Sequence, residues 1–187
     1  MEGTMKRLAL HDRKAWVEQA PIPSAHGANV VVRLESTPIC GSDKKHFLNP
    51  DKTIRYAGHE GTGVVVEVDK SNLVKVGDRV LTNCLSGCGV CEHCRSGNYV
   101  YCENKLPMDQ MASHFCQYTI LQDFLCIPLP EDISYDMGTL AGCVLAPAFQ
   151  TLQKMQVIPS DLVMVLGCGP VGLGAITIAK HYGRSEE

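Results

Sequence analysis

The pattern of hydrophobic and polar residues divides the chain into two parts that meet near Pro130. Before this residue, short apolar runs alternate with polar positions and are separated by turn residues, a pattern that predicts β-strands. The segments with the clearest strand pattern are 29–34, 61–68, 79–82, 115–120 and 124–128. The first part of the chain therefore predicts a mainly β domain with many turns, such as a small barrel.

After Pro130 the apolar residues change to a different spacing. Residues 135–156 have the spacing of an amphipathic helix. The continuous apolar run at 161–166 is typical of a buried strand in a parallel sheet, and 172–181 predicts an apolar helix directly behind it. The second part thus begins as an α/β structure.

Composition and charge exclude several classes of protein. Hydrophobic residues make up 45% of the 187 residues, which is enough for a folded core. The net charge is −3 and no basic stripe is present, so neither nucleic acid nor an anionic membrane is an expected partner. No apolar run is long enough to span a bilayer, and residues 1–10 lack a secretory signal. We expect a cytoplasmic protein.

Four of the ten cysteines fall within fifteen residues of one another, at Cys88, Cys91, Cys94 and Cys102. Two short C-x-x-C steps and one longer step can bring four thiolates to one ion, and Gly87, Gly89 and Gly97 give the loop its freedom to turn. An iron–sulfur cluster and a group of reduced thiols are the alternatives. We favour one structural zinc, because four cysteines leave no coordination position open for a substrate.

The glycine motif Gly167-Cys-Gly-Pro-Val-Gly has the form G-x-G-x-x-G and lies between the expected strand and helix. In that context Gly169 would let a pyrophosphate approach the backbone, and Gly172 would let the helix pack closely on the strand. We expect the residues that bind a dinucleotide to be those of this turn: Gly167, Gly169, Pro170, Val171 and Gly172. A tight turn without a ligand is the alternative.

Two further motifs contain metal-binding residue types, Cys40-Gly-Ser-Asp and Gly58-His-Glu. Cys40 and His59 are typical zinc ligands, and Asp43 could orient the imidazole of His59 as a second-shell carboxylate. Ser42 could pass a proton from the metal site. On residue types alone, a second metal site and an ordinary buried cysteine and histidine both stay open.

The order of these motifs resembles that of the zinc-dependent medium-chain dehydrogenases, the alcohol and polyol dehydrogenase family. The resemblance implies a GroES-like β-barrel catalytic domain at 1–147, with a zinc lobe at 84–104. The start of an incomplete Rossmann domain would follow at 148–187. It also implies oxidation of an alcohol or polyol to an aldehyde or ketone, with hydride transfer to NAD or NADP. Two zinc ions per chain and a homo-oligomeric full-length protein are expected.

By the same resemblance, Cys40, His59 and Cys143 would be ligands of a catalytic zinc, and Glu60 would be a carboxylate that can approach it. Ser42 would take the proton of the alcohol towards solvent. Many relatives have a histidine five residues after the first ligand, where this chain has a lysine. His46, one residue later, either continues the relay or is a solvated loop residue.

The sequence reaches only the first βα unit of a nucleotide-binding domain, and the residue that separates NAD from NADP is expected about 20 residues beyond the glycines. We therefore expect a fragment of a longer enzyme that holds zinc but turns substrate over slowly or not at all. A zinc-binding fragment without catalysis is the alternative function. We expect His93 to be exposed, and buried apolar thiols at Cys84, Cys116, Cys126 and Cys168.

Overall fold

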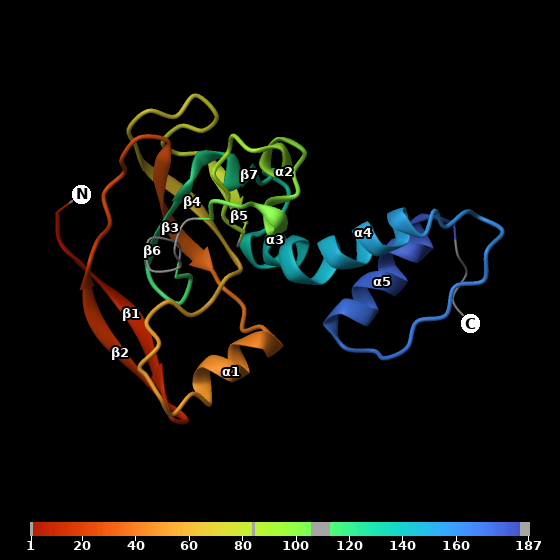
Figure 1. Ribbon diagram of the computed structural model, residues 1–187, viewed down its shortest axis with the longest axis horizontal. Coiled ribbons are helices and arrows are strands. Elements are labelled where there is room, and N and C mark those ends of the chain that lie inside the picture. The colour runs from red at the N-terminus through yellow and green to blue at the C-terminus, as the bar shows by residue number, and fades with distance from the viewer. Residues whose placement is uncertain (1, 84, 106–112, 184–187) are drawn as a thin grey trace. The chain divides into compact units, whose positions relative to one another are not determined.

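The computed structural model describes residues 2–83, 85–105 and 113–183, and it divides into two compact units, Met1–Thr139 and Leu140–Glu187 (Figure 1). This division lies a few residues before the domain boundary expected from the sequence. Cys84 and part of the segment that leads out of the cysteine lobe lie outside the described residues.

The first unit is mainly β, as the sequence predicts. Its strands are β1 (Thr4–His11), β2 (Lys14–Pro21), β3 (Asn29–Ser36), β4 (Gly61–Val68), β5 (Arg79–Thr82), β6 (Tyr118–Gln122) and β7 (Cys126–Pro128). An antiparallel five-stranded sheet has the order β6-β3-β4-β5-β7, and β1 and β2 form a separate hairpin. The expected strands at 29–34, 61–68 and 79–82 are confirmed, and the two later ones begin two or three residues further on.

The core of this unit lies around the middle strands of the sheet. Val30, Val31 and Val32 are fully buried because β3 has neighbours on both sides. A cluster of apolar side chains from several strands completes the core, and it comprises Val30, Val32, Val65, Val74, Val80, Leu121, Leu125 and Cys126. Burial of β-branched side chains from adjacent strands stabilises this sheet and fixes its register.

The β1–β2 hairpin is joined to the rest of the unit by its backbone. Asp12 and Arg13 form its tight turn with positive φ angles of 40° and 62°. The Leu8 N–H donates to the Phe115 carbonyl at 2.8 Å, and the Gln117 N–H donates to the Lys6 carbonyl at 3.1 Å. The segment before β6 therefore lies against β1 and also reaches the loop that precedes β4.

Short helices lie in the connections of the first unit. They are η1 (Gly41–Asp43), α1 (Lys44–Phe47), α2 (Glu92–Arg95), η2 (Tyr99–Tyr101) and η4 (Asp123–Leu125). The first pair follows Cys40, and the second pair lies within the cysteine lobe. The expected metal ligands are therefore held at the ends of strands and short helical turns, a usual place for binding residues.

The second unit is helical. After α3 (Tyr135–Leu140) the chain continues through a π-helical turn, η5 (Ala141–Leu145), into α4 (Ala146–Lys154). The helix α5 (Pro170–His181) packs on η5 and α4. A Cβ atom at Gly174 would lie 2.8 Å from the Val144 carbonyl oxygen, so this glycine allows α5 to approach the π-helical turn closely. The helices expected at 135–156 and 172–181 are confirmed.

The buried strand expected at 161–166 is wrong for the described structure. The segment is irregular, and Leu162, Met164 and Leu166 are 98%, 79% and 87% exposed. A strand is stabilised by backbone hydrogen bonds to a neighbouring strand, and no strand among the described residues pairs with this segment. Val163 and Val165 are half-buried, whereas the other three apolar side chains of the segment face solvent. Within the described part of the chain, no helix has the length and apolar character needed to cross a membrane.

Candidate metal centres and nucleotide-binding turn

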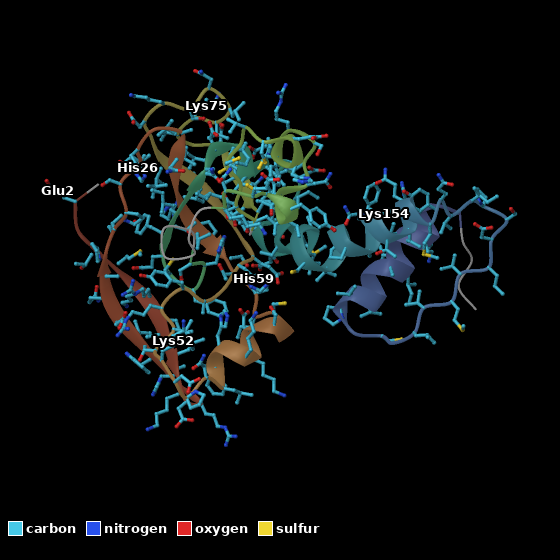
Figure 2. All side chains as sticks on the ribbon, viewed as in Figure 1. Glu2, His26, Lys52, His59, Lys75 and Lys154 are labelled. Atoms are coloured by element: carbon cyan, nitrogen blue, oxygen red, sulfur yellow. The ribbon has the colours of Figure 1, made fainter. Side chains whose placement is uncertain are left out.

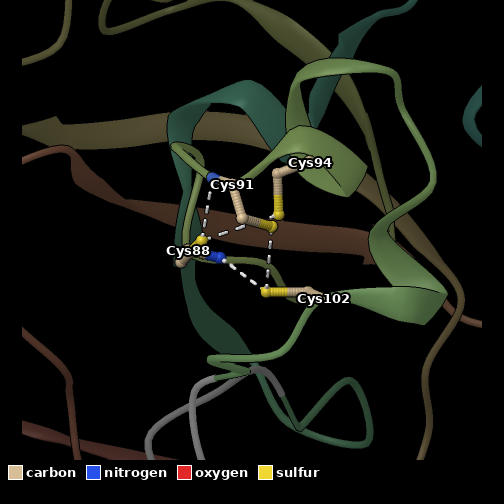
Figure 3. Close-up of side chains that lie close together, drawn as sticks. All are labelled: Cys88, Cys91, Cys94 and Cys102. Atoms are coloured by element: carbon tan, nitrogen blue, oxygen red, sulfur yellow. Dashed lines mark hydrogen bonds between the residues drawn. The ribbon is translucent and has the colours of Figure 1, made fainter.

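The four cysteines of the lobe point their sulfur atoms toward one another (Figure 3). All four Sγ atoms lie within 4.8 Å of one another. Cys88 and Cys94 approach to 3.9 Å between their sulfurs, and Cys91 and Cys102 approach to 4.0 Å. Two backbone groups also donate to sulfur: the Cys91 N–H to Cys88 at 3.3 Å and the Cys88 N–H to Cys102 at 3.2 Å.

These distances fit a tetrahedral metal ion. Zn–S bonds of about 2.3 Å in a tetrahedron place the sulfurs about 3.8 Å apart, close to the separations in the lobe. A disulfide would need sulfurs about 2.05 Å apart, and the described cysteines are all free thiols. The donor set of four sulfurs suits zinc, and it is the set found in closed structural sites.

The charges of the lobe also favour a cation. Hydrogen bonds from the backbone N–H groups of Val90 and Cys91 lower the pKa of Cys88 to about 6, whereas burial raises the pKa of Cys94 to about 12. One thiol is thus readily ionised because backbone N–H groups stabilise its anion, and a neighbour resists ionisation because it is buried. A bound cation would let all four ionise.

The lobe is tied to the sheet by one side-chain amide. The Gln122 Nε2 donates to the Gly87 carbonyl at 2.6 Å, and the Gly87 N–H donates to Gln122 Oε1 at 3.2 Å. Because Gln122 is the last residue of β6, this pair of hydrogen bonds fixes the chain immediately before Cys88. A Cβ atom at Gly87 would lie only 2.6 Å from the Cys94 sulfur.

A second group of ligand atoms lies on the loops around η1 and β4 of the first unit. The Cys40 sulfur, a ring nitrogen of His59 and a carboxylate oxygen of Glu60 lie within 4.8 Å of one another. Cys40 precedes η1, and the other two residues directly precede β4 (His59 is labelled in Figure 2). Thiolate, imidazole and carboxylate are the ligand types of catalytic zinc sites, so the donor set fits the metal that the sequence predicts.

Asp43 contacts both of the first two candidate ligands. Its Oδ2 accepts a hydrogen bond from the Cys40 N–H at 2.9 Å, and its Oδ1 lies 3.4 Å from Nδ1 of His59. This carboxylate is only 4% exposed. It can hold the proton on Nδ1 and so leave Nε2 as the ligand atom. The expected role of Asp43 in orienting His59 stays a prediction.

Glu60 lies on the other side of the imidazole. Its Oε1 is 3.3 Å from Nε2 of His59, and the residue is 5% exposed. A buried carboxylate beside a ligand nitrogen is favourable when a cation lies between them. The fourth expected residue, Cys143, lies in η5 of the second unit, and its place in this site stays a prediction.

The two expected proton-relay residues differ in their surroundings. Ser42 is exposed in η1, and His46 is half-buried in α1. Burial lowers the pKa of His46, and the charge of Lys45 lowers it further, although Asp43 acts in the opposite direction. His46 is therefore neutral at pH 7 and able to accept a proton. Its place in a relay stays a prediction.

The glycine motif forms a turn into α5 in the second unit. Gly167 has a positive φ of 99°, and Gly169 is the N-cap of α5 with Pro170 as the first helical residue. A side chain at Gly172 would collide with the carbonyl oxygen of Gly167, so the turn requires glycine there. Val171 follows in the first helical turn and is 49% exposed. The N–H groups of this helical turn are suited to an anion.

The remaining cysteine and histidine predictions have mixed outcomes. Cys126 is buried as expected and Cys116 is half-buried, with pKa values that burial raises to about 12 and about 11. The prediction that Cys168 is buried is wrong, because it lies in the exposed turn before α5. The expected exposure of His93 is also wrong, since its ring lies 5.8 Å from that of Tyr101 and it is half-buried.

Sequence reasoning missed one buried polar residue next to the second ligand group. His114 is 1% exposed, and its Nε2 lies 2.6 Å from the hydroxyl of Thr82. No motif marks this histidine, because its contacts come from residues more than thirty positions away in the chain. Only the fold brings it beside the segment that contains His59.

Comparison with known proteins agrees with this fold. Residues 26–131, more than half of the chain, match the family described as the alcohol dehydrogenase GroES-like domain. The chain therefore belongs to the family of proteins that contain this domain, and the predicted resemblance is confirmed.

Individual relatives are zinc-type and polyol dehydrogenases. A probable D-xylulose reductase A of Aspergillus clavatus is 34% identical over 184 residues, which cover 90% of this chain and 50% of that protein. The uncharacterized zinc-type alcohol dehydrogenase-like protein YphC of Escherichia coli is 31% identical over 182 residues, covering 89% and 52%. The structure of the alcohol dehydrogenase TADH from Thermus sp. ATN1 is 28% identical with a TM-score of 0.86, covering 97% and 56%. The chain thus spans about half the length of the relatives that it matches.

Proposed function

We propose that the protein acts in the zinc-dependent oxidation of an alcohol or polyol to an aldehyde or ketone, with hydride transfer to NAD or NADP. The observation that carries this proposal is the group formed by Cys40, His59 and Glu60, with Asp43 behind it. Because the group includes a neutral ligand and a thiol as well as a carboxylate, it differs from a closed four-cysteine site. The lobe at 88–102 would then hold a second, structural zinc.

Within this site each residue has a separate task. Cys40 and His59 would hold the metal, with Cys143 as the proposed further protein ligand, and zinc would supply a Lewis acid that favours deprotonation of an alcohol. Asp43 keeps the Nδ1 proton of His59 in place and so fixes the ring orientation. Glu60 places a buried negative charge beside the ligand nitrogen.

The alcohol proton has a candidate path along η1 and α1. The Ser42 hydroxyl is exposed and can both accept and donate a proton, and His46 can accept one because its pKa is lowered. A relay from Ser42 to His46 would therefore move the proton to solvent. Ser42 and then His46 follow Cys40 in the chain, and this succession supports a relay from Ser42 to His46.

The turn at 167–172 is the proposed cofactor site. Gly169 and Pro170 begin α5, and its first N–H groups can bind the pyrophosphate of a dinucleotide. When bound, NAD or NADP would accept the hydride. The close approach of Gly172 to Gly167 supports a turn selected for shape rather than for side-chain chemistry.

The substrate class rests on the relatives. One of them is described as a D-xylulose reductase. The motif Cys40-Gly-Ser-Asp resembles that of the polyol and threonine dehydrogenases more than that of the ethanol dehydrogenases. A spectrophotometric assay at 340 nm with NAD⁺ or NADP⁺ and a set of polyols and simple alcohols tests the proposal. Reduction of NAD⁺ or NADP⁺ that is lost in the His59→Ala variant and kept in the Lys154→Ala variant would support it. Lys154 is an exposed residue of α4 and serves as the control.

The 187-residue chain is also tested without turnover. Cobalt can replace zinc, and its visible spectrum reports the ligands of each site. If adding a polyol changes the cobalt spectrum of the wild type but not that of His59→Ala, the result would support substrate binding at the proposed site. If neither turnover nor this change occurs while both metals are bound, the alternative holds: a zinc-binding chain without catalysis.

A further inference from the structure

The dipeptide that carries two candidate metal ligands is held at both ends by residues outside either sequence motif. His59 and Glu60 lie between Gly58 and Gly61, at the entrance to β4. Glycines flank them on both sides, so the sequence alone leaves this segment free to adopt many conformations. Contacts with other parts of the first unit must therefore fix the direction of both side chains.

The N-terminal side of the dipeptide is fixed by the segment before β6. The carbonyl oxygen of Ala57 accepts hydrogen bonds from the His114 N–H at 3.1 Å, the Phe115 N–H at 3.1 Å and the Ser113 hydroxyl at 3.0 Å. The His114 N–H is shared with the Gly58 carbonyl at 3.3 Å. Ala57 is fully buried, so these donors replace water that cannot reach it.

The C-terminal side is fixed by the ring of the same histidine. The Thr82 hydroxyl donates to the Gly61 carbonyl at 2.9 Å and lies 2.6 Å from Nε2 of His114. Since the single hydroxyl hydrogen is used for Gly61, the ring must donate its Nε2 proton to the hydroxyl oxygen. His114 is thus the tautomer protonated at Nε2.

Close packing completes the arrangement. A Cβ atom at Gly61 would lie 2.8 Å from Cδ2 of His114, and one at Gly58 would lie 2.8 Å from the Phe115 backbone nitrogen. Gly58 also has a positive φ of 77°, which other residues rarely adopt. Both glycines are therefore in direct contact with the segment that contains His114.

We propose that His114 is a positioning residue for the metal site: its backbone and its ring hold the two ends of the Gly58–Gly61 segment and so aim His59 and Glu60. The ring acts through Thr82 and touches neither metal nor substrate. This inference rests on the proposed function, because it assumes that the Cys40, His59 and Glu60 group binds a metal. It gives a role to a buried histidine that belongs to no motif.

The chain offers a matched pair of variants for the test. Thr82 and Thr119 are both 2% exposed and both lie in strands of the same sheet. The Thr82 hydroxyl links His114 to Gly61, whereas the Thr119 hydroxyl forms no hydrogen bond among the described residues. Valine has the same shape as threonine, so Thr82→Val removes the link and Thr119→Val removes only a hydroxyl.

The measurement is a cobalt titration of the whole chain, followed by chelator competition at each site. The four-cysteine lobe serves as the internal reference, since its spectrum contains only sulfur ligands. Loss of a supporting contact typically weakens metal binding about 10- to 100-fold. We expect Thr82→Val and His114→Leu each to weaken the second site about tenfold, to leave the lobe unchanged and to give no further loss when combined. His114→Gln, which keeps an N–H donor near the Nε2 position, should recover most of the affinity.

Equal metal affinity of the second site in Thr82→Val and Thr119→Val would overturn the inference. It would also be overturned if His114→Leu and His114→Gln each weakened the lobe as much as the second site. A wild-type chain that binds metal only at the lobe would instead contradict the proposed function. In that case amide hydrogen exchange of residues 57–61 in the metal-free chain decides the inference. Faster exchange in Thr82→Val than in Thr119→Val supports the positioning role, and equal exchange rejects it.

Discussion

The close contact between Gly87 and the Cys94 sulfur predicts that a side chain at this position weakens metal binding by the lobe. In Gly87→Ala the new Cβ would lie 2.6 Å from Cys94 Sγ and 3.1 Å from a ring carbon of Tyr99. Non-bonded carbon atoms prefer about 3.5–4.0 Å, so the sulfur would have to move by about 1 Å. A Zn–S bond tolerates a change of only about 0.2 Å, so metal and methyl group compete for the same space.

The magnitude follows from the cost of overpacking, which is about 1–3 kcal/mol. In the metal-free chain the Cys94 side chain can rotate away, so this cost falls mainly on the metal-bound state. At about 1.4 kcal/mol for each factor of ten, Gly87→Ala should weaken zinc binding by about 5- to 140-fold. The Gln122 amide, bonded to both backbone groups of Gly87, opposes a compensating shift of the chain.

The assay is chelator competition in a His59→Ala background, where the lobe is the only expected metal site. Gly97→Ala is the control, because Gly97 has a positive φ of 77° but no atom within 4 Å of the Cβ position. It should reduce stability through backbone strain and leave zinc affinity near that of the parent. If Gly87→Ala binds zinc as tightly as Gly97→Ala, the sulfur positions derived from the fold are wrong.

Three further predictions concern the rest of the chain. Burial raises the pKa of Glu18, but hydrogen bonds from Arg7 and Arg55 outweigh this effect and leave the pKa below 4.5. The ion pair therefore stabilises the fold above pH 4.5, and this stabilisation is lost in acid as the carboxylate is protonated. Glu18→Gln should lower the free energy of unfolding in urea at pH 7 by up to about 1 kcal/mol, and a difference that persists in acid would contradict this. In iodoacetamide labelling at pH 8 followed by mass spectrometry, exposed Cys168 should react well before Cys116, whose pKa is about 11; equal rates would refute the burial of Cys116. Gly172→Ala should lower the Tm because its methyl group meets a backbone carbonyl, whereas Gly169→Ala, with nothing within 4 Å, should not; the assay is thermal unfolding followed by circular dichroism.

Hydrophobic patterning was sufficient for the elements that complete their own packing within the chain. The strands at 29–34, 61–68 and 79–82 lie in one sheet, where each pairs with neighbouring strands. Their hydrophobic pattern predicts their positions in the chain closely. The run at 161–166 has the same apolar character, but the described residues supply no strand beside it. A buried strand depends on neighbouring strands, so the pattern showed that the segment is apolar but could not show whether it forms a strand.

The candidate sites divide in a similar way. Cysteine spacing predicts the lobe because four ligands within fifteen residues can meet through local turns. Residue types also suggest Asp43 as a partner of His59, and its Oδ1 lies 3.4 Å from Nδ1 of that ring. His114 and Thr82 were not predictable, because their link to Gly61 arises from sheet register and joins residues 21 and 32 positions apart in the chain. Such contacts carry no local signal.

We expect two metal sites of different kinds in this chain, a closed lobe and a site that includes His59. Native mass spectrometry of the zinc-loaded chain tests this, with Cys91→Ser and His59→Ala measured beside it. We expect two zinc ions for the wild type and one for each variant, with none for the double variant. A single zinc that survives His59→Ala and disappears in Cys91→Ser would contradict it.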